Sequence, residues 1–338
     1  MFKLSKTRRA ATLGTFALAA GLVTAAETAH ATDPMKLTLN FLAQPAQAGF
    51  FLAKEKGYYK DAGIDLTIVE GKGSSTTAQI TAAGQNDVGF INASIVISLI
   101  NKGAPLKIIA APIQGNFMSL GFLSKENIKT PKDLVGKTIG VCPGCAQIPM
   151  VKALLAKNGI SDQVKVINVD QSAHVSMLEE GKIDAVAGDP NSISIEMRHR
   201  GDKVSDMFFQ DWGIGLVNFV LAARTDKLNA NPDLYKRFVA ASLKGWHDVL
   251  SHPDEAISAL QHQYPEIKLD RKTLLTQLNE GIAPFICVKD SPGVGEASPA
   301  LWNTTYDVMT KYMGLKPTLK VTDIYTDAYL PKPLPACK

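Results

Sequence analysis

The feature that most constrains the fold of this chain is a regular alternation of short apolar runs with stretches of helical spacing. The first set of apolar runs, each followed by small or polar residues and then a helical pattern, covers residues 36–41, 64–69, 87–91 and 106–111. Strands that alternate with helices over short loops are typical of a parallel sheet with helices on both faces. The sequence therefore predicts an α/β fold.

The same alternation begins again further along the chain. A second set of predicted strands covers residues 119–123, 138–141, 164–169 and 183–187, and an extended run follows at 216–226. From Pro232 onward the pattern is mostly helical, and no repeat of solenoid period is present in the sequence. Two successive sets of strands predict two α/β lobes.

The first residues have the pattern of a secretory signal. A basic start leads into an apolar run over residues 10–26, and Ala29-His30-Ala31 is a small-x-small cleavage site. The apolar run is short and broken by glycines, whereas a membrane span needs about 20 apolar residues. We therefore expect residues 1–31 to be a signal peptide that is cleaved near Ala31, and the remaining chain to be periplasmic.

Charge and motifs exclude several classes of function. Residues 1–31 carry four basic residues and one acidic residue, so without them the formal net charge falls from +4 to +1. Nucleic acids and anionic membranes attract clustered positive charge, so we expect neither as a partner. The sequence has no HExxH, no serine-centred glycine elbow and no P-loop. We expect no cofactor, no metal and no enzymatic activity.

Four segments of the sequence resemble periplasmic solute-binding proteins of ABC importers. These segments are GFFLAKEKGYYKDAGIDLTIVEGKGSS, NDVGFINAS, IKTPKDLVGKTIGV and LEEGKIDAVAGDP. The branch that they resemble binds nitrate, alkanesulfonates, taurine and thiamine-pyrimidine precursors, and it is related to the fungal thiamine-pyrimidine synthase. The resemblance runs from about Lys36 to Asp226. It implies that two lobes close by hinge bending on a small-molecule ligand and deliver it to an ABC permease with its ATPase.

The resemblance also implies how the chain divides between the lobes. The fold expected is a type II-like periplasmic-binding-protein fold, in which each lobe is a mainly parallel sheet and the chain crosses between the lobes twice. The crossings are expected near 119–123 and 216–223. The first lobe then consists of residues 35–118 and the mostly helical 224–338, and the second lobe of residues 119–223. We expect the protein to be a monomer.

Ligand-binding residues are expected in the loops at the carboxyl ends of the strands, where open parallel sheets bind their ligands. Small residues there let a ligand approach backbone N–H groups at a helix start. The candidates in the first lobe are Gln44, Gly49, Ser74, Ser75, Asn92, Ser94, Gln114 and Asn116. The candidates in the second lobe are Cys142, Gly144, Cys145, Ala146, Asp189 and Asn191, with Trp212 as a wall of the pocket. Ser74 or Ser75 could equally be a plain helix N-cap.

The stretch GVCPGCAQ at residues 140–147 is open to several interpretations. Nearby thiols tend to pair in an oxidising compartment, which favours a Cys142–Cys145 disulfide over free thiols, a redox-active pair or half of a metal site. Four cysteines allow three pairings, and we predict the second bond between Cys287 and Cys337, tying the tail to the first lobe. The cysteine-dense iron motif of the fungal synthase is absent, which argues against pyrimidine-forming chemistry.

The candidate loops are rich in side-chain amides and contain no arginine. Amides offer both donors and acceptors, which suits a neutral heterocycle, whereas an anion would depend on helix N-termini and hydroxyls. We therefore predict a pyrimidine-like or other nitrogenous aromatic ligand. The alternatives are a sulfonate, nitrate or aromatic carboxylate ligand, an enzyme on the same scaffold that uses Cys142 and Cys145, and a sensor module. His174 starts its helix and could face the cleft, but we expect it instead to cap the helix or to be exposed.

Overall fold

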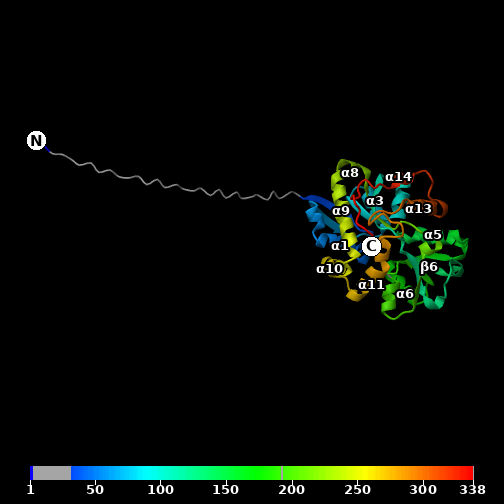
Figure 1. Ribbon diagram of the computed structural model, residues 1–338. Coiled ribbons are helices and arrows are strands. Elements are labelled where there is room, and N and C mark those ends of the chain that lie inside the picture. The colour runs from blue at the N-terminus through cyan, green and yellow to red at the C-terminus, as the bar shows by residue number, and fades with distance from the viewer. Residues whose placement is uncertain (3–31, 192, 338) are drawn as a thin grey trace. The chain divides into compact units, whose positions relative to one another are not determined.

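The computed structural model describes residues 1–2, 32–191 and 193–337 (Figure 1). The predicted cleavage site and all but the first two residues of the predicted signal peptide lie outside the described residues. Residues from Thr32 onward form one structural unit. In the described ranges, none of the helices combines the length and the apolarity that a membrane span requires.

The first of two five-stranded sheets has the strand order β2-β1-β3-β10-β4. Its strands are β1 (Asp33–Thr38), β2 (Ile64–Val69), β3 (Val88–Asn92), β4 (Leu106–Ile113) and β10 (Phe219–Arg224). Strand β1 runs parallel to β2 and β3, whereas β10 runs antiparallel to β3 and β4. All five residues of the central β3 are buried, which explains its continuous apolar sequence, because strands covered on both faces have no polar side.

The second sheet has the order β7-β6-β8-β5-β9. Its strands are β5 (Ser119–Leu123), β6 (Thr138–Val141), β7 (Lys165–Asn168), β8 (Ala185–Gly188) and β9 (Val204–Phe208). Here β6 is parallel to β7 and β8, and β5 is antiparallel to β8 and β9. Each sheet therefore has three adjacent parallel strands and one antiparallel strand that arrives from the other sheet. The predicted fold of two mainly parallel α/β lobes is confirmed.

The chain passes from the first sheet to the second between β4 and β5, and it returns between β9 and β10. Residues 219–223 were expected in the second lobe, but they belong to β10 and therefore to the first sheet. The reason is their pairing, because Phe219 lies opposite Asn92 of β3 and opposite Ile113 of β4.

Helices connect and cover the strands. The α-helices are α1 (Ala48–Glu55), α2 (Tyr58–Asp61), α3 (Ser74–Ala82), α4 (Ala93–Asn101), α5 (Gln147–Lys157), α6 (His174–Glu179), α7 (Ser194–His199), α8 (Thr225–Ala230), α9 (Pro232–Val249), α10 (Pro253–Gln263), α11 (Arg271–Gly281), α12 (Ala283–Ile286), α13 (Pro299–Tyr312) and α14 (Val321–Ile324). Short 3₁₀ segments are η1 (Pro45–Gln47), η2 (Ser124–Glu126), η3 (Pro131–Leu134), η4 (Ser161–Gln163), η5 (Gln171–Ala173) and η6 (Phe209–Trp212).

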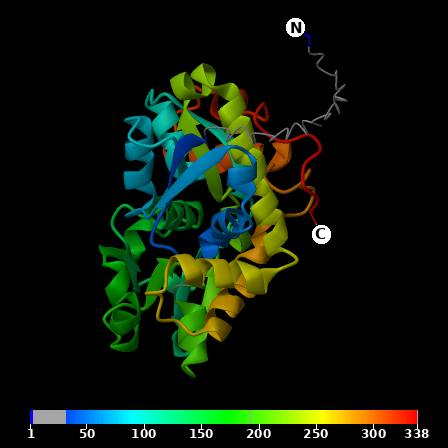
Figure 2. The same cartoon turned by 90° about the vertical axis from the view of Figure 1, so that its left-hand side faces the viewer.

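The C-terminal helices contact elements of both lobes. Helix α9 packs on α1 of the first lobe, whereas α11 packs on α7 and α13 packs on α5 of the second (Figures 1 and 2). The α7–α11 contact includes a 2.7 Å hydrogen bond between His199 Nδ1 and Thr273 Oγ1. The region predicted to belong to the first lobe therefore also supports the second.

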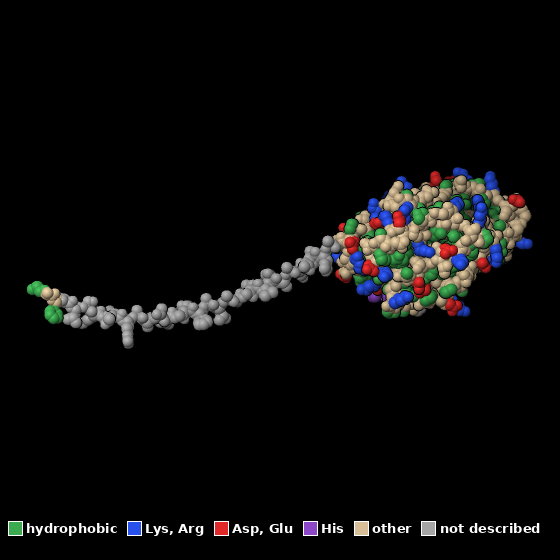
Figure 3. Space-filling view, turned by 90° about the horizontal axis from the view of Figure 1, so that it is seen from above, with side chains coloured by type: hydrophobic (Ala, Val, Ile, Leu, Met, Phe, Trp, Pro, Cys, Tyr) green, Lys and Arg blue, Asp and Glu red, His purple; other side chains and the backbone are tan. Residues whose placement is uncertain are grey.

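The surface of the unit carries no single-sign patch on the face shown in Figure 3, where basic and acidic side chains are interspersed. This distribution agrees with the low net charge of the sequence. Surfaces that bind nucleic acid concentrate positive charge on one face, and this face does not.

Candidate functional site

A cleft between the two sheets brings together loops from both lobes. The free volume inside it is only about 40 Å³, although the space between its walls is about 560 Å³ with the open mouth included. The predicted site residues that line it are Gln44, Ser74, Cys142, Cys145, Ala146 and Asp189. The remaining lining residues are Asn40, Phe41, Ala46, Gly73, Phe117, Met118, Gln147, Gln171, His174, Ala187, Gly188 and Phe219.

The loop after β1 is held by side-chain amides. Gln47 is fully buried, and its Nε2 donates to Asn40 Oδ1 at 2.7 Å, while its Oε1 accepts from the backbone N–H of Gln44 at 3.1 Å. These bonds fix the start of η1 and orient Asn40 at the cleft. The small Ala46 in the same turn lets the backbone form part of the wall.

Ser74 begins α3, but it does not act as the N-cap. The N-cap residue is Gly73, at φ +104°, a backbone conformation that favours glycine. Ser74 Oγ instead accepts a 3.2 Å hydrogen bond from the backbone N–H of Asn92. The serine therefore joins the loop after β2 to the end of β3 while it lines the cleft. Ser75 lies outside the lining, at the point where this loop approaches Gly144 of the second lobe.

The second lobe contributes the loop between β6 and α5. Cys142 and Cys145 form a disulfide, as predicted, with their Cα atoms 5.4 Å apart. The backbone N–H of Cys145 donates to the carbonyl of Cys142 at 3.2 Å, so the bond closes a tight turn around Gly144 at φ +74°. Both cysteines and Ala146 line the cleft.

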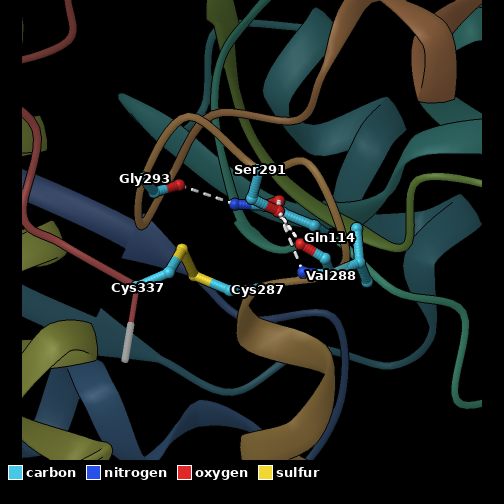
Figure 4. The surroundings of a disulfide bond; sticks show 6 residues. All are labelled: Gln114, Cys287, Val288, Ser291, Gly293 and Cys337. Atoms are coloured by element: carbon cyan, nitrogen blue, oxygen red, sulfur yellow. Dashed lines mark hydrogen bonds between the residues drawn. A yellow bond between two sulfur atoms is a disulfide. The ribbon is translucent and has the colours of Figure 1, made fainter.

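The second predicted disulfide, between Cys287 and Cys337, is also present. Figure 4 shows that it joins the tail to the segment after α12, close to Gln114. Gln114 does not line the cleft. Its Nε2 donates to the carbonyl of Gly293 at 2.8 Å, and its Oε1 accepts from Ser291 Oγ (Figure 4). The glutamine is fully buried and holds the 288–293 loop.

Two further predicted amides are also structural. Asn92 Oδ1 accepts from the backbone N–H and the hydroxyl of Ser94 at 3.1 and 2.7 Å, which caps α4, and its Nδ2 donates to Asn218 Oδ1 at 3.0 Å. Asn116 Nδ2 donates to the carbonyl of Ile214 at 3.0 Å. Asn92, Ser94 and Asn116 are therefore buried behind the cleft wall and lie outside its lining.

Three other candidates lie away from the cleft for packing reasons. Gly49 lies in α1 against the ring of Trp246, where a side chain would collide. Asn191 is buried against Gly281 of α11. The carbonyl of Trp212 accepts from Lys157 Nζ at 3.0 Å, and its ring packs on the hydrophobic core. The structure gives these residues roles in packing and not in the cleft wall.

The predicted site residues did not include Asn40, Met118, His174, Ala187 or Gly188, which line the cleft. Asn40 lies two residues after the end of β1 and Gly188 ends β8, so the carboxyl-end rule could have found them. Met118 and Ala187 carried no polar signal. His174 was expected to cap its helix or to be exposed, but it lines the cleft and only 2% of it is exposed. Its ring is buried against the β7–α6 connection, where Nε2 lies 3.1 Å from the carbonyl oxygen of Val169.

The described lining of the cleft carries negative charge and no lysine or arginine. Among the described lining residues, Asp189 is the only aspartate, glutamate, lysine or arginine. Its Oδ1 accepts from the backbone N–H of Asn191 at 3.0 Å, which fixes the carboxylate. Lys72, in the loop between β2 and α3, is exposed and not part of the lining. Across the described ranges, no group of three His, Cys, Asp or Glu side chains is arranged to hold a metal.

Comparison with known proteins places the chain in a defined group. A sequence model of the NMT1/THI5-like family matches residues 44–256. The chain is 26% identical over 237 residues to the formylaminopyrimidine-binding protein of Halalkalibacterium halodurans, covering 68% of this chain and 71% of that protein. It is 26% identical over 306 residues to the riboflavin-binding protein RibY of Chloroflexus aurantiacus, covering 87% and 85%.

A solved structure supports the description of the fold. The alkanesulfonate-binding protein SsuA from Xanthomonas axonopodis, bound to MOPS, superposes with a TM-score of 0.67 at 16% identity, over 87% of this chain and 98% of that one. At this identity the similarity concerns the fold alone. The two-lobed fold is therefore shared with this solved structure.

Proposed function

The chain belongs to the NMT1/THI5-like family, and on this basis we propose that it is the substrate-binding component of an ABC importer. In this role it captures a small solute in the cleft between its lobes and delivers it to the permease. The proposal is supported by relatives that are named as formylaminopyrimidine-binding and riboflavin-binding proteins and that are matched over most of their length.

The proposed ligand is a pyrimidine-like or other nitrogenous aromatic solute. The observation that carries this choice is the charge of the cleft, where the described lining offers Asp189, side-chain amides and backbone groups but no lysine or arginine. A sulfonate about 5 Å from Asp189 would be repelled by about 3 kcal/mol at an effective dielectric constant of 20. An amino-substituted ring instead gains from the carboxylate, because hydrogen bonds to ionised groups are the stronger ones.

The cleft also has apolar surfaces that suit a flat ring. Phe41, Phe117 and Phe219 line it together with Met118. Aromatic and thioether side chains make favourable contacts with the face or edge of an aromatic ligand. We propose that Gln44, Ser74, Cys142, Cys145, Ala146 and Asp189, of the residues predicted from the sequence, contact the ligand.

We propose that binding is accompanied by hinge closure of residues 35–118 and 219–338 on residues 119–218, with β10 assigned to the first lobe. Closure of two lobes around a ligand is a common mechanism in two-domain binding proteins. The proposed compartment is the periplasm, because the basic and apolar N-terminal pattern predicts export and disulfides persist in oxidising compartments.

We propose that the protein does not alter its ligand. An enzyme based on Cys142 or Cys145 would need a thiolate as its nucleophile or metal ligand, and the two sulfur atoms are joined to each other. The observed bond therefore favours a structural role for the pair over the alternative of an enzyme on the same scaffold that uses Cys142 and Cys145.

A thermal-shift screen tests the proposal. The purified protein is heated with aminopyrimidines, riboflavin, alkanesulfonates, taurine, nitrate and aromatic carboxylates, each in excess. A ligand at 100 times its Kd stabilises the folded protein by about 2.7 kcal/mol, which raises the melting temperature by about 4 °C for a folded unit of about 300 residues. We expect the largest shift with a nitrogen heterocycle. A larger shift with sulfonate or nitrate would reject the ligand class, and conversion of the bound heterocycle, detected by chromatography, would reject the binding role.

A further inference from the structure

His174 is the one residue of the described cleft lining with a buried, unpaired polar side-chain atom. It is the first residue of α6, and its exposed fraction is only 2%. Its Nε2 lies 3.1 Å from the carbonyl oxygen of Val169. Within the described ranges, its Nδ1 is buried and has no hydrogen-bond partner.

The partner of Nε2 determines which nitrogen carries the proton. A carbonyl oxygen only accepts hydrogen bonds, so Nε2 must be the N–H donor. Burial lowers the pKa of His174 from its usual value, which keeps the ring neutral. In the neutral ring the other nitrogen is then an acceptor, so Nδ1 presents a lone pair. A buried acceptor without a partner costs about 1–3 kcal/mol.

We infer that Nδ1 of His174 accepts a hydrogen bond from an N–H group of the ligand, and that the ligand is therefore a heterocycle with an amino substituent. The inference rests on the proposed function and narrows its ligand class. Asp189 lines the same cleft from the end of the neighbouring strand β8. The second lobe therefore presents two acceptors to the cleft, and a ring edge made only of acceptors leaves Nδ1 of His174 without a donor.

Two probes of similar size separate this interaction from ring binding in general. The first is 4-amino-2-methylpyrimidine, and the second is 2,4-dimethylpyrimidine, in which a methyl group replaces the amino group. Calorimetric titrations at pH 8 keep His174 neutral. We expect the protein to bind the amino probe at least 10-fold more tightly, because 1.4 kcal/mol corresponds to a tenfold change in affinity.

The variant His174→Phe removes the acceptor and keeps a flat ring. We expect the preference for the amino probe to fall to less than threefold. The amino probe loses its acceptor and binds more weakly, whereas the dimethyl probe binds no worse than before. The control is His199→Phe, since His199 lies in α7 of the same lobe outside the cleft lining. This control should keep the preference of the unaltered protein.

The outcomes distinguish failure of the inference about His174 from failure of the proposed function. An unchanged preference in His174→Phe would overturn the inference and leave the proposed function standing. Failure of the unaltered protein to bind either probe, while sulfonates do bind, would overturn both. If His174→Phe does not fold, nitrogen NMR of the protein labelled at its histidines provides the test. We expect the Nδ1 resonance of His174 to move on addition of the amino probe and not the dimethyl probe, and an unmoved Nδ1 resonance would overturn the inference.

Discussion

Gly73 of the first lobe and Gly144 of the second lie against each other, because a Cβ atom placed on Gly73 would come 3.4 Å from the carbonyl oxygen of Gly144. Both glycines have positive φ, +104° and +74°. They belong to the β2–α3 and β6–α5 loops, which line the cleft from opposite lobes. The two lobes therefore approach each other where neither loop carries a side chain, and this approach limits the space left for a ligand.

Gly73→Ala should weaken ligand binding as well as stability. A side chain in this glycine-only backbone region (φ +104°, ψ 147°) costs about 1–3 kcal/mol, and this strain falls on a loop that lines the cleft in contact with the Gly144 carbonyl. We expect a several-fold rise in the Kd for an aminopyrimidine, measured by calorimetry. Gly103→Ala is the matched control, because Gly103 has φ +90° with open space around it and lies outside the cleft lining. It should lower the melting temperature without changing the Kd, and equal Kd values in both variants would contradict the prediction.

The two disulfides should differ in what their removal affects. Loop-closure entropy predicts a loss of about 4 kcal/mol in unfolding free energy for the Cys287–Cys337 bond and about 2 kcal/mol for the Cys142–Cys145 bond, because their sequence separations are 50 and 3. The ligand affinity should respond in the opposite order, since only Cys142 and Cys145 line the cleft.

Paired serine substitutions at each bond test this difference. Urea titration gives the unfolding free energy, and calorimetry gives the Kd for an aminopyrimidine at a temperature where both variants are folded. We expect the Cys142→Ser, Cys145→Ser protein to lose affinity and the Cys287→Ser, Cys337→Ser protein to retain it. Loss of affinity only in the second protein would show that the tail, and not the β6–α5 loop, shapes the cleft.

The sequence could predict what depends on local spacing. The alternation of apolar runs and helical stretches predicted the described strands of both sheets except β9 (Val204–Phe208), and the short spacing of Cys142 and Cys145 suggested their bond. The fate of the polar residues at the strand ends depends instead on distant partners. Gln114 was expected in the cleft, but the carbonyl of Gly293, 179 residues away, takes its amide. Asn116 is bound in the same way by Ile214, 98 residues away.

Dependence on distant partners also explains why the lobe boundary near residue 219 was misplaced and why His174 was not expected in the cleft. The run at 216–226 looks like a strand, but only its pairing with Asn92 and Ile113 assigns it to the first sheet. Gly49 looks like a site of close approach to a ligand, and the group that approaches it is the Trp246 ring. For His174, the helix start was visible in the sequence, whereas its burial in the cleft depends on how the second lobe folds around it.

Asp189→Asn should weaken the binding of an amino-substituted heterocycle. The variant keeps the Oδ1 acceptor for the N–H of Asn191 but loses the charge, and hydrogen bonds to charged groups are worth about 1 kcal/mol more than neutral ones. We expect a five- to tenfold rise in the Kd of 4-amino-2-methylpyrimidine and no loss of affinity for methanesulfonate. Asp211→Asn, an exposed position outside the lining, is the control. A Kd that does not change in Asp189→Asn would place the amino group elsewhere.

The stability of the protein should fall on mild acidification because of His174. Burial, the largest influence, lowers its pKa in the folded state from the usual 6.5, and the hydrogen bond to Val169 and the charge of Asp170 oppose this shift. Protonation of His174 then favours the unfolded chain. The contribution of the neutral ring to the free energy of unfolding is therefore complete above pH 6.5 and is lost as the pH falls towards the folded-state pKa. The loss is at most about 1.4 kcal/mol per pH unit. We expect the melting temperature to fall more steeply from pH 7.5 to 5.5 in the unaltered protein and in His199→Phe than in His174→Phe. Saturation with 4-amino-2-methylpyrimidine should move the fall in melting temperature to lower pH, because a ligand N–H bound to Nδ1 competes with the proton. Parallel melting profiles for all three proteins would show that the imidazole of His174 is not held neutral in the cleft.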